Sequence, residues 1–235
     1  MNRIIVTGAA KGIGRATTQR LLKDGYKVVA VDVDRSALDQ LQADTEGRLE
    51  VKYCNIASDA EVSALFSELS ERPAYGLVNN AGLYLGKSWE RYSQDEIARV
   101  LGVNLGGAIL MSRHFADLLT RSRAEGVIVN IGSMSMYGGS DPVYSTTKAG
   151  LVGLTKACAK VLAPFIRVNL VAPGIVETGM LATLPDDVVA GYRNSELVKK
   201  PLIANDVANT ISFLLSDSAR NYTGAVFDLN NGFHV

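Results

Sequence analysis

The chain has 235 residues, of which 47% are hydrophobic and 20% are charged, so the apolar side chains are sufficient for a large core. Lysine plus arginine equals aspartate plus glutamate at 24 each, and this balance gives no electrostatic case for nucleic acid or an anionic membrane as a partner. The two cysteines, Cys54 and Cys158, lie far apart, and the two histidines are His114 and His234. Neither a disulfide framework nor a metal site is therefore expected.

The chain passes from Met1-Asn2-Arg3 almost directly into a strand-like run, and no apolar stretch is long enough to span a bilayer. We therefore expect no signal peptide, no membrane segment and a cytoplasmic location. At this length a single α/β domain over residues 1–235 is a better expectation than two domains.

The first strand is predicted over residues 3–7, where Ile4-Ile5-Val6 is a β-branched run typical of a buried parallel strand. A glycine-rich turn, Thr7-Gly8-Ala9-Ala10-Lys11-Gly12-Ile13-Gly14, leads into a helical pattern over 15–24. Glycines let the backbone approach a pyrophosphate, and the free N–H groups of the helix point at it. The spacing is not G-x-G-x-x-G, so the turn indicates a phosphate cradle mainly through its place at the first strand–helix junction.

A second strand is predicted over residues 27–32, and it ends in Asp32. In a dinucleotide-binding fold a carboxylate at this position accepts hydrogen bonds from the adenosine ribose and repels a 2′-phosphate. Asp32 therefore favours NAD over NADP. Lys11 and Arg35 are both able to reach a 2′-phosphate and leave NADP open, and a solvent-facing acid at the start of a turn is the alternative interpretation of Asp32.

The rest of the chain continues to alternate between strand and helix. Further strands are predicted over 49–53, 75–79, 127–131, 166–171 and 225–229, and further helices over 36–42, 59–69, 94–104, 106–121, 144–162 and 206–215. Residues 175–200 have weak periodicity and indicate a mobile substrate flap, in which Pro185-Asp186-Asp187 is able to begin a short helix. This order predicts a doubly wound α/β fold: a parallel sheet with helices on both faces.

Tyr144 and Lys148 stand four residues apart in a predicted helix, so their side chains project from one face. A phenol has a pKa near ~10 and is almost wholly protonated at neutral pH. An adjacent ammonium lowers that pKa and makes the tyrosine usable as proton donor and acceptor. Ser133, just after a predicted strand, adds a hydroxyl for a substrate oxygen. Alone the pair is weak, because solvated helix faces often carry one tyrosine and one lysine at this spacing.

Together these motifs resemble the short-chain dehydrogenase/reductase family, in its short single-domain branch, over nearly the whole chain. The matching residues are the Thr7–Gly14 turn, Asp32, Asn79-Asn80-Ala81-Gly82, Asn104, Ser133, Tyr144 with Lys148, and Pro173-Gly174 followed by Thr178. The resemblance implies a Rossmann-type fold with a seven-stranded sheet in the order 3-2-1-4-5-6-7. It also implies hydride transfer between a nicotinamide dinucleotide and an alcohol or carbonyl carbon.

The resemblance further implies individual roles. Tyr144 is expected to be the acid/base, Lys148 to lower its pKa and hold the nicotinamide ribose, Ser133 to orient the substrate oxygen, and Asn104 to steady a water in a proton relay. The expected cofactor-binding residues are Gly8, Lys11, Gly12, Ile13, Gly14, Asp32, Asn55, Ile56, Asn80, Ala81, Gly82, Tyr144, Lys148, Pro173, Gly174, Val176 and Thr178. No residue is expected to bind a metal.

Some positions depart from the family pattern. Asn55-Ile56 stands where an Asp before Val is common, and an amide can still accept the hydrogen bond of the adenine amine. Gly132-Ser133 replaces a Ser-Ser pair, which leaves Ser135 as a second candidate for the substrate-orienting hydroxyl. Aromatic and methionine side chains border the substrate pocket by this resemblance, with core packing as the alternative account: Tyr84, Trp89, Met134, Met136 and Tyr137.

Three functions remain open. The main expectation is an NAD(H)-dependent oxidoreductase acting on a secondary alcohol or ketone. The alternative is a 3-oxoacyl carrier-protein reductase using NADPH, whose acidic partner could meet Arg113, Arg121 and Arg123, although a solvated helix face explains these residues as well. Asp32 counts against it, because such reductases commonly prefer NADPH. A dinucleotide-binding protein without turnover is the third, and it would not need the complete Ser133–Tyr144–Lys148 set.

The resemblance also implies a homotetramer or homodimer with a small-molecule substrate. The expected interfaces are the helices around 106–121 and 144–162 and the last strand. Gly150, Gly153 and Ala157 would allow helices to approach closely there.

Overall fold

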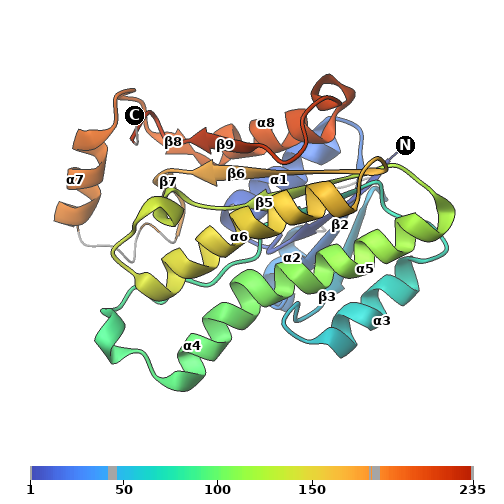
Figure 1. The fold of residues 1–235 in the computed structure, drawn as a ribbon, viewed down its shortest axis with the longest axis horizontal. Helices are drawn as coiled ribbons and strands as arrows, with labels where there is room; N and C mark the ends of the chain where they lie inside the picture. The colour runs from blue at the N-terminus through green and yellow to red at the C-terminus, as the bar shows by residue number, and fades with distance from the viewer. Residues whose placement is uncertain (1, 42–46, 180, 182–185, 234–235) are drawn as a thin grey trace.

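A seven-stranded parallel sheet forms the centre of the computed structural model, which describes residues 2–41, 47–179, 181 and 186–233 (Figure 1). In spatial order its strands are β3 (Leu49–Tyr53), β2 (Lys27–Asp32), β1 (Arg3–Thr7), β4 (Gly76–Asn79), β5 (Gly126–Ile131), β6 (Ile166–Pro173) and β9 (Val226–Leu229). The predicted fold class and strand order are confirmed. The seventh strand is β9 because two short strands, β7 (Val176–Glu177) and β8 (Leu202–Ile203), pair with each other outside this sheet.

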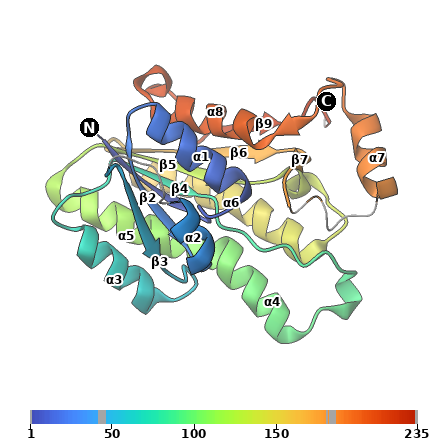
Figure 2. The ribbon, with the colours of Figure 1, turned by 180° about the vertical axis from the view of Figure 1, so that it is seen from behind.

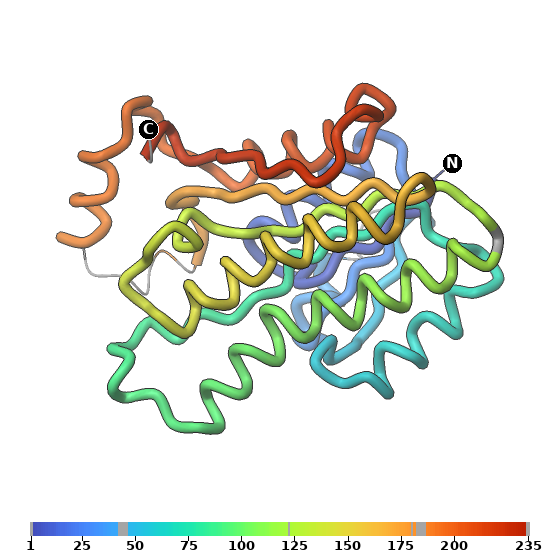
Figure 3. Tube along the Cα trace, in the orientation of Figure 1, coloured from blue at the N-terminus to red at the C-terminus, as the bar shows by residue number. Residues whose placement is uncertain are grey.

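Helices cover both faces of the sheet (Figures 1 and 2). On one face lie α1 (Gly12–Lys23), α2 (Arg35–Leu41) and α8 (Ala204–Leu215), and on the other lie α3 (Asp59–Leu69), α5 (Gly107–Ser122) and α6 (Pro142–Val161). Helix α4 (Gln94–Leu101) leads into α5, and α7 (Asp186–Ser195) lies at the same end of the molecule as the start of α6 (Figure 3). No helix in the described ranges is long and apolar enough to cross a membrane.

The sheet is buried on both faces, and this explains its continuous apolar strands. In β1, Ile4 and Val6 point into the core that contains Leu21 of α1, whereas Ile5 points into the opposite core, which contains Phe115 of α5. Successive side chains of a strand face opposite sides, so a strand between two helical layers is apolar at every position.

The predicted break at Leu105 is wrong. Helices α4 and α5 are joined without interruption by a π-helical turn, Gly102–Gly106, which contains Asn104. The Asn104 amide is buried and bonded to the backbone of Leu83, so a polar residue occupies the helix interior without breaking it. A π turn of this kind is often found at functional sites.

Helix α6 begins two residues earlier than predicted, at Pro142. The Asp141 side chain accepts a hydrogen bond from the backbone N–H of Tyr144 at 3.0 Å, and proline is favourable in a first helical turn. Helix α1 likewise begins at Gly12 rather than at residue 15. Residue 42 of the predicted second helix, and residues 180 and 182–185 of the predicted flap, lie outside the described residues.

Candidate active site

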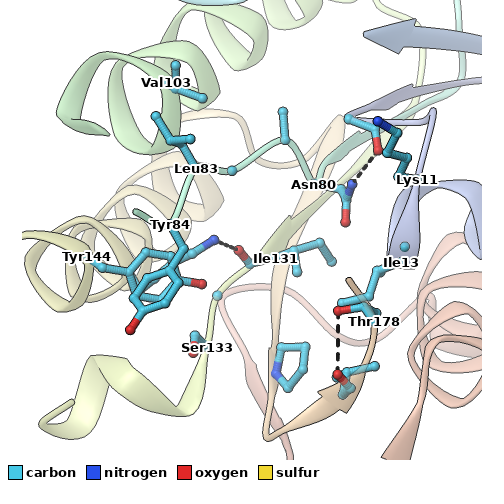
Figure 4. Close-up of a pocket in the computed structure, with 18 of the residues that line it drawn as sticks. Lys11, Ile13, Asn80, Leu83, Tyr84, Val103, Ile131, Ser133, Tyr144 and Thr178 are labelled. Atoms are coloured by element: carbon cyan, nitrogen blue, oxygen red, sulfur yellow. Dashed lines mark hydrogen bonds between the residues drawn. The ribbon is translucent and has the colours of Figure 1, made fainter. Parts of the chain in front are cut away.

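A cavity of about 560 Å³ lies at the C-terminal ends of the strands. Segments that follow β1, β2, β4, β5 and β6 all line it, as expected for a ligand site in an open parallel sheet. Figure 4 shows Ser133, Tyr84 and Tyr144 at one end and Lys11 and Ile13 at the other. The cavity therefore extends from the glycine turn after β1 to the hydroxyl groups of Ser133 and Tyr144.

The structure brings nearly all of the predicted site residues together. Those that line the cavity are Gly8, Lys11, Gly12, Ile13, Asp32, Asn55, Ile56, Asn80, Ala81, Gly82, Ser133, Tyr144, Lys148, Pro173, Gly174, Val176 and Thr178. Gly14 and Asn104 do not line it: both are buried behind its wall.

The glycine turn is shaped by close backbone contacts. Gly8 has a φ of +63°, and a Cβ there would lie 2.8 Å from the Cα of Ala81. A Cβ on Gly14 would lie 2.0 Å from the carbonyl oxygen of Gly8, so Gly14 closes the turn from behind. No side chain caps the N-terminus of α1 and its first turn has no acidic residue. Its first backbone N–H groups are consequently suited to an anion.

The turn after β4 holds the glycine turn in place. Thr7 Oγ1 accepts hydrogen bonds from the backbone N–H groups of Asn80 and Ala81, both at 3.0 Å. The Asn80 side chain donates in return to the carbonyl oxygens of Thr7 (2.9 Å) and Gly8 (3.1 Å). These four bonds fix the relative position of β1 and β4 where the cavity begins.

Asp32 lies at the end of β2 and is held by backbone donors. One carboxylate oxygen accepts from the N–H of Ala10 at 3.0 Å, and the other from the N–H groups of Val33 and Asp34. The nearby cations have other partners: Lys11 Nζ lies 2.6 Å from Asp34 Oδ2, and the Arg35 guanidinium lies 5.0 Å from the centre of the Tyr53 ring.

Ser133, Tyr144 and Lys148 meet at the opposite end of the cavity. Ser133 lies two residues after β5 and caps the short 3₁₀ helix Met134–Tyr137: its hydroxyl accepts from the N–H of Ser135 at 3.1 Å and donates to Ser135 Oγ at 3.2 Å. Lys148 is 3% exposed, its Nζ donates to the carbonyl oxygen of Ile131 at 2.8 Å, and it lies 5.5 Å from the centre of the Tyr144 ring. The geometry thus collects two hydroxyls and an amine on one wall.

The predicted lowering of the Tyr144 pKa is wrong for this structure. Burial raises the pKa of Tyr144 to about 12, and a hydrogen bond with Ser133 opposes that rise only in part. Burial also lowers the pKa of Lys148 to about 8, since an ammonium loses water there. The Nζ of Lys148 points to Ile131, so desolvation outweighs the attraction that the sequence spacing suggested.

Asn104 acts on the cavity through the backbone of its wall. Its Oδ1 accepts from the N–H of Leu83 at 2.7 Å, and its Nδ2 donates to the carbonyl oxygen of Leu83 and to Thr147 Oγ1. Asn104 therefore links the segment after β4 to α6 at Thr147, the residue directly before Lys148.

Sequence reasoning did not select Asp141 and Tyr192, which also line the substrate end of the cavity. The Asp-Pro pair before the tyrosine was an available signal for Asp141, because Asp is a common N-cap and Pro a common first helical residue. Tyr192 lies on α7, where weak periodicity gave no such signal. Tyr84 was expected at the pocket, and its ring meets Tyr144 edge-on with centroids 5.2 Å apart.

Comparison with known proteins identifies the family to which the chain belongs. A family model described as enoyl-(acyl carrier protein) reductase matches residues 8–234. The 3-oxoacyl-[acyl-carrier-protein] reductase FabG of Thermotoga maritima is 34% identical, over 98% of this chain and 97% of that protein. A short-chain dehydrogenase/reductase from Brucella melitensis, described as glucose/ribitol dehydrogenase, superposes with a TM-score of 0.93 at 29% identity, over 100% of this chain and 97% of that one. The chain belongs to the short-chain dehydrogenase/reductase family.

As a short-chain dehydrogenase/reductase, the chain is an NAD(P)-dependent oxidoreductase. The FabG of Escherichia coli is also similar, with 31% identity over 98% of this chain and 96% of that protein. A structure titled 4-hydroxyisoleucine dehydrogenase complexed with NADH superposes with a TM-score of 0.91 at 28% identity. The superposition covers 100% of this chain and 99% of that one. The FabG relatives support the alternative expectation, a 3-oxoacyl reductase, better than the main one.

Proposed function

We propose that this chain reduces the 3-oxo group of a 3-oxoacyl thioester, with NADH as hydride donor. The observation that carries this proposal is that one cavity joins the glycine turn and Asp32 to Ser133, Tyr144 and Lys148. The FabG relatives, similar over nearly their full length, support the 3-oxoacyl substrate. Asp32 supports NADH.

The residues present fit a nicotinamide dinucleotide. The uncapped start of α1 would take the pyrophosphate, Asp32 the adenosine ribose, and Lys148 the nicotinamide ribose. The remaining cofactor contacts are proposed for Asn55, Ile56, Asn80, Ala81, Gly82, Pro173, Gly174, Val176 and Thr178. When bound, this cofactor supplies the hydride.

Tyr144 would supply the proton of the reduction. Negative charge grows on the carbonyl oxygen as the carbon is reduced, and donors placed at that oxygen stabilise the charge. The hydroxyl of Ser133 would donate one hydrogen bond, and the phenol of Tyr144 would donate the second and then its proton. A pKa of about 12 keeps Tyr144 protonated at neutral pH, which suits the direction of reduction.

The cofactor preference follows from charge at the ribose position. The Asp32 carboxylate would repel a 2′-phosphate, and Lys11 and Arg35 are already engaged with Asp34 and Tyr53. We expect kcat/KM to be higher with NADH than with NADPH. Asp32→Ser should narrow that ratio by about tenfold or more, since it removes about 1.4 kcal/mol or more of discrimination.

A second candidate is NAD-linked oxidation of a small secondary alcohol. It is favoured by the likeness to a structure titled as a 4-hydroxyisoleucine dehydrogenase complexed with NADH. Asp141 lines the cavity close to Tyr144, so a substrate with a free carboxylate would meet the carboxylate of Asp141 near the reacting group.

The test is the absorbance of reduced nicotinamide in the presence of 3-oxoacyl thioesters, simple ketones and secondary alcohols, each with both cofactors. NADH-linked turnover of the thioesters above that of the ketones supports the proposal. Turnover of secondary alcohols alone supports the second candidate, and turnover with NADPH alone contradicts the role given to Asp32.

The assembly is also a proposal. Ile109 of α5 and Val161 of α6 are 44% and 75% exposed, and a Cβ on Gly153 would meet no atom within 4 Å. Exposed apolar side chains on two adjacent helices favour a homodimer or homotetramer, which light scattering would measure. The cytoplasmic location stays a prediction.

A further inference from the structure

Asp141 contributes a buried carboxylate to the substrate end of the cavity. The residue is 5% exposed and lines the cavity beside Ser140 and Tyr144. One oxygen accepts from the N–H of Tyr144 at 3.0 Å, and the other from the hydroxyl of Tyr92 at 2.6 Å. Within the described ranges, no lysine, arginine or histidine forms an ion pair with it.

Two lysines in this part of the fold, Lys87 and Lys148, have partners other than Asp141. Lys87 Nζ lies 5.2 Å from the centre of the Tyr92 ring and 2.5 Å from Glu96 Oε2, so its charge is already balanced. Lys148 donates to Ile131. A carboxylate has about four acceptor positions, and the recorded bonds of Asp141 fill two of them. It therefore keeps acceptor capacity on a side chain that is 5% exposed and lines the cavity.

Aromatic rings surround this carboxylate. Tyr84 meets Tyr144 edge-on, and Tyr192 of α7 lines the same cavity. Burial raises the pKa of Tyr84, and the charge of Asp141 raises it further, so the two groups are close enough to interact. Tyrosine faces beside a carboxylate favour an N–H donor, because both ring faces and carboxylate present negative potential.

We propose that Asp141 is a specificity-determining residue that binds an N–H group of the substrate while the reacting carbonyl lies at Ser133 and Tyr144. The inference rests on the proposed function and narrows its substrate to 3-oxoacyl thioesters with an N–H donor. That donor is an amide in the arm attached through sulfur or an ammonium group on the acyl chain. Both present the same chemistry to Asp141.

The test compares Asp141→Asn with the unchanged protein on matched thioesters. Asparagine caps a helix as well as aspartate, and its side-chain oxygen can still accept a hydrogen bond, so the substitution removes mainly the charge. The 3-oxobutanoyl thioester of N-acetylcysteamine has an amide N–H, the S-ethyl thioester has none, and a third S-ethyl thioester has an ammonium at the end of its acyl chain. Asp95→Asn, an exposed carboxylate in the first turn of α4, is the control variant.

We expect Asp141→Asn to lower kcat/KM for an N–H-bearing thioester about 10- to 100-fold more than for the plain S-ethyl thioester, chiefly through KM. A selective loss on the N-acetylcysteamine thioester places the donor in the arm, and a selective loss on the ammonium thioester places it on the acyl chain. An equal loss on all three, or none on any, overturns the proposal and leaves Asp141 as a helix cap.

Failure of the proposed function has a different signature: the unchanged protein would turn over none of the thioesters with NADH. The Asp141→Asn comparison would then be made with two ketones or secondary alcohols that the protein does accept, one with an ammonium group and one without. A selective loss on the ammonium compound supports the role of Asp141, and an equal effect on both contradicts it.

Discussion

Lys148 Nζ donates a hydrogen bond to the carbonyl oxygen of Ile131 at 2.8 Å and so fastens α6 to the C-terminal end of β5. Ser133 follows Ile131 by two residues, and Tyr144 lies about one helical turn before Lys148. This bond therefore sets the separation between the serine on the strand end and the tyrosine on the helix. The spacing of Tyr144 and Lys148 in the sequence places these two residues relative to each other on α6, but it does not place them relative to Ser133.

Replacing Tyr144 by phenylalanine should remove turnover and preserve cofactor binding. The ring and its edge contact with Tyr84 remain, but the proton donor is lost, which costs a rate factor of about 10²–10⁴. Initial rates and NADH fluorescence titration measure the two quantities separately. The control is Tyr26→Phe, because Tyr26 does not line the cavity. Turnover close to that of the unchanged protein would show that Tyr144 is not the acid.

Lys148 should make stability rise with pH across its titration range. Burial lowers its pKa from 10.5 to about 8, so between these values the unfolded chain binds more protons than the folded chain. The stabilisation from Lys148 is thus fully present above 10.5 and is lost as the pH falls through about 8. Across that window the difference in unfolding free energy between the unchanged protein and Lys148→Met should change by about 3 kcal/mol.

Urea unfolding of both proteins at a series of pH values gives this difference directly. Tyr144 has its pKa raised to about 12 and works in the opposite direction above pH 10, where the unfolded chain loses the phenol proton first. Its contribution is present in both proteins and largely cancels. A difference that does not vary with pH would show that Lys148 is not desolvated in the folded protein.

The parallel sheet could be predicted from the sequence because the patterns that indicate strands and helices are local and recur along the chain. β-Branched runs alternate with helical periodicity, and a parallel sheet buried on both faces requires such runs, as Ile4, Ile5 and Val6 illustrate. The glycine turn and Asp32 were found for the same reason, since each stands at a strand end. Their place in the cavity follows once the strand order is known.

What the sequence could not supply depends on contacts between distant segments. Asn104 lies in the π turn and bonds to the backbone of Leu83, 21 residues away. Helical periodicity predicts neither the π turn nor these bonds. The direction of the Tyr144 pKa depends on how deeply the pair is buried and on the choice of Ile131 as partner for Lys148. Spacing along one helix gives neither quantity.

Gly14→Ala should disrupt the dinucleotide end of the cavity. The new Cβ would lie 2.0 Å from the carbonyl oxygen of Gly8 and 2.6 Å from Asn80 Nδ2, so the backbone of the turn must move. We expect a loss of about 2 kcal/mol or more in unfolding free energy, together with weaker NADH binding. Gly191→Ala, in α7, is the control: its Cβ would meet nothing within 4 Å. That change should stabilise by about 0.5–1 kcal/mol. Equal NADH affinity in the two variants would contradict the role given to Gly14.

Asn104→Ala should impair both stability and catalysis, although Asn104 does not line the cavity. The substitution leaves the N–H and carbonyl oxygen of Leu83 without the side-chain partner that holds them, which costs of the order of 3 kcal/mol if both stay buried. The released segment contains Tyr84, whose ring packs against Tyr144, so kcat should fall more than NADH affinity.

Asn205→Ala, at an exposed position in the first turn of α8, controls for loss of an amide in a helix. If Asn104→Ala unfolds at the same urea concentration as Asn205→Ala, the bonds to Leu83 do not hold the wall. If it is destabilised but keeps its kcat, Asn104 supports the fold without positioning Tyr144.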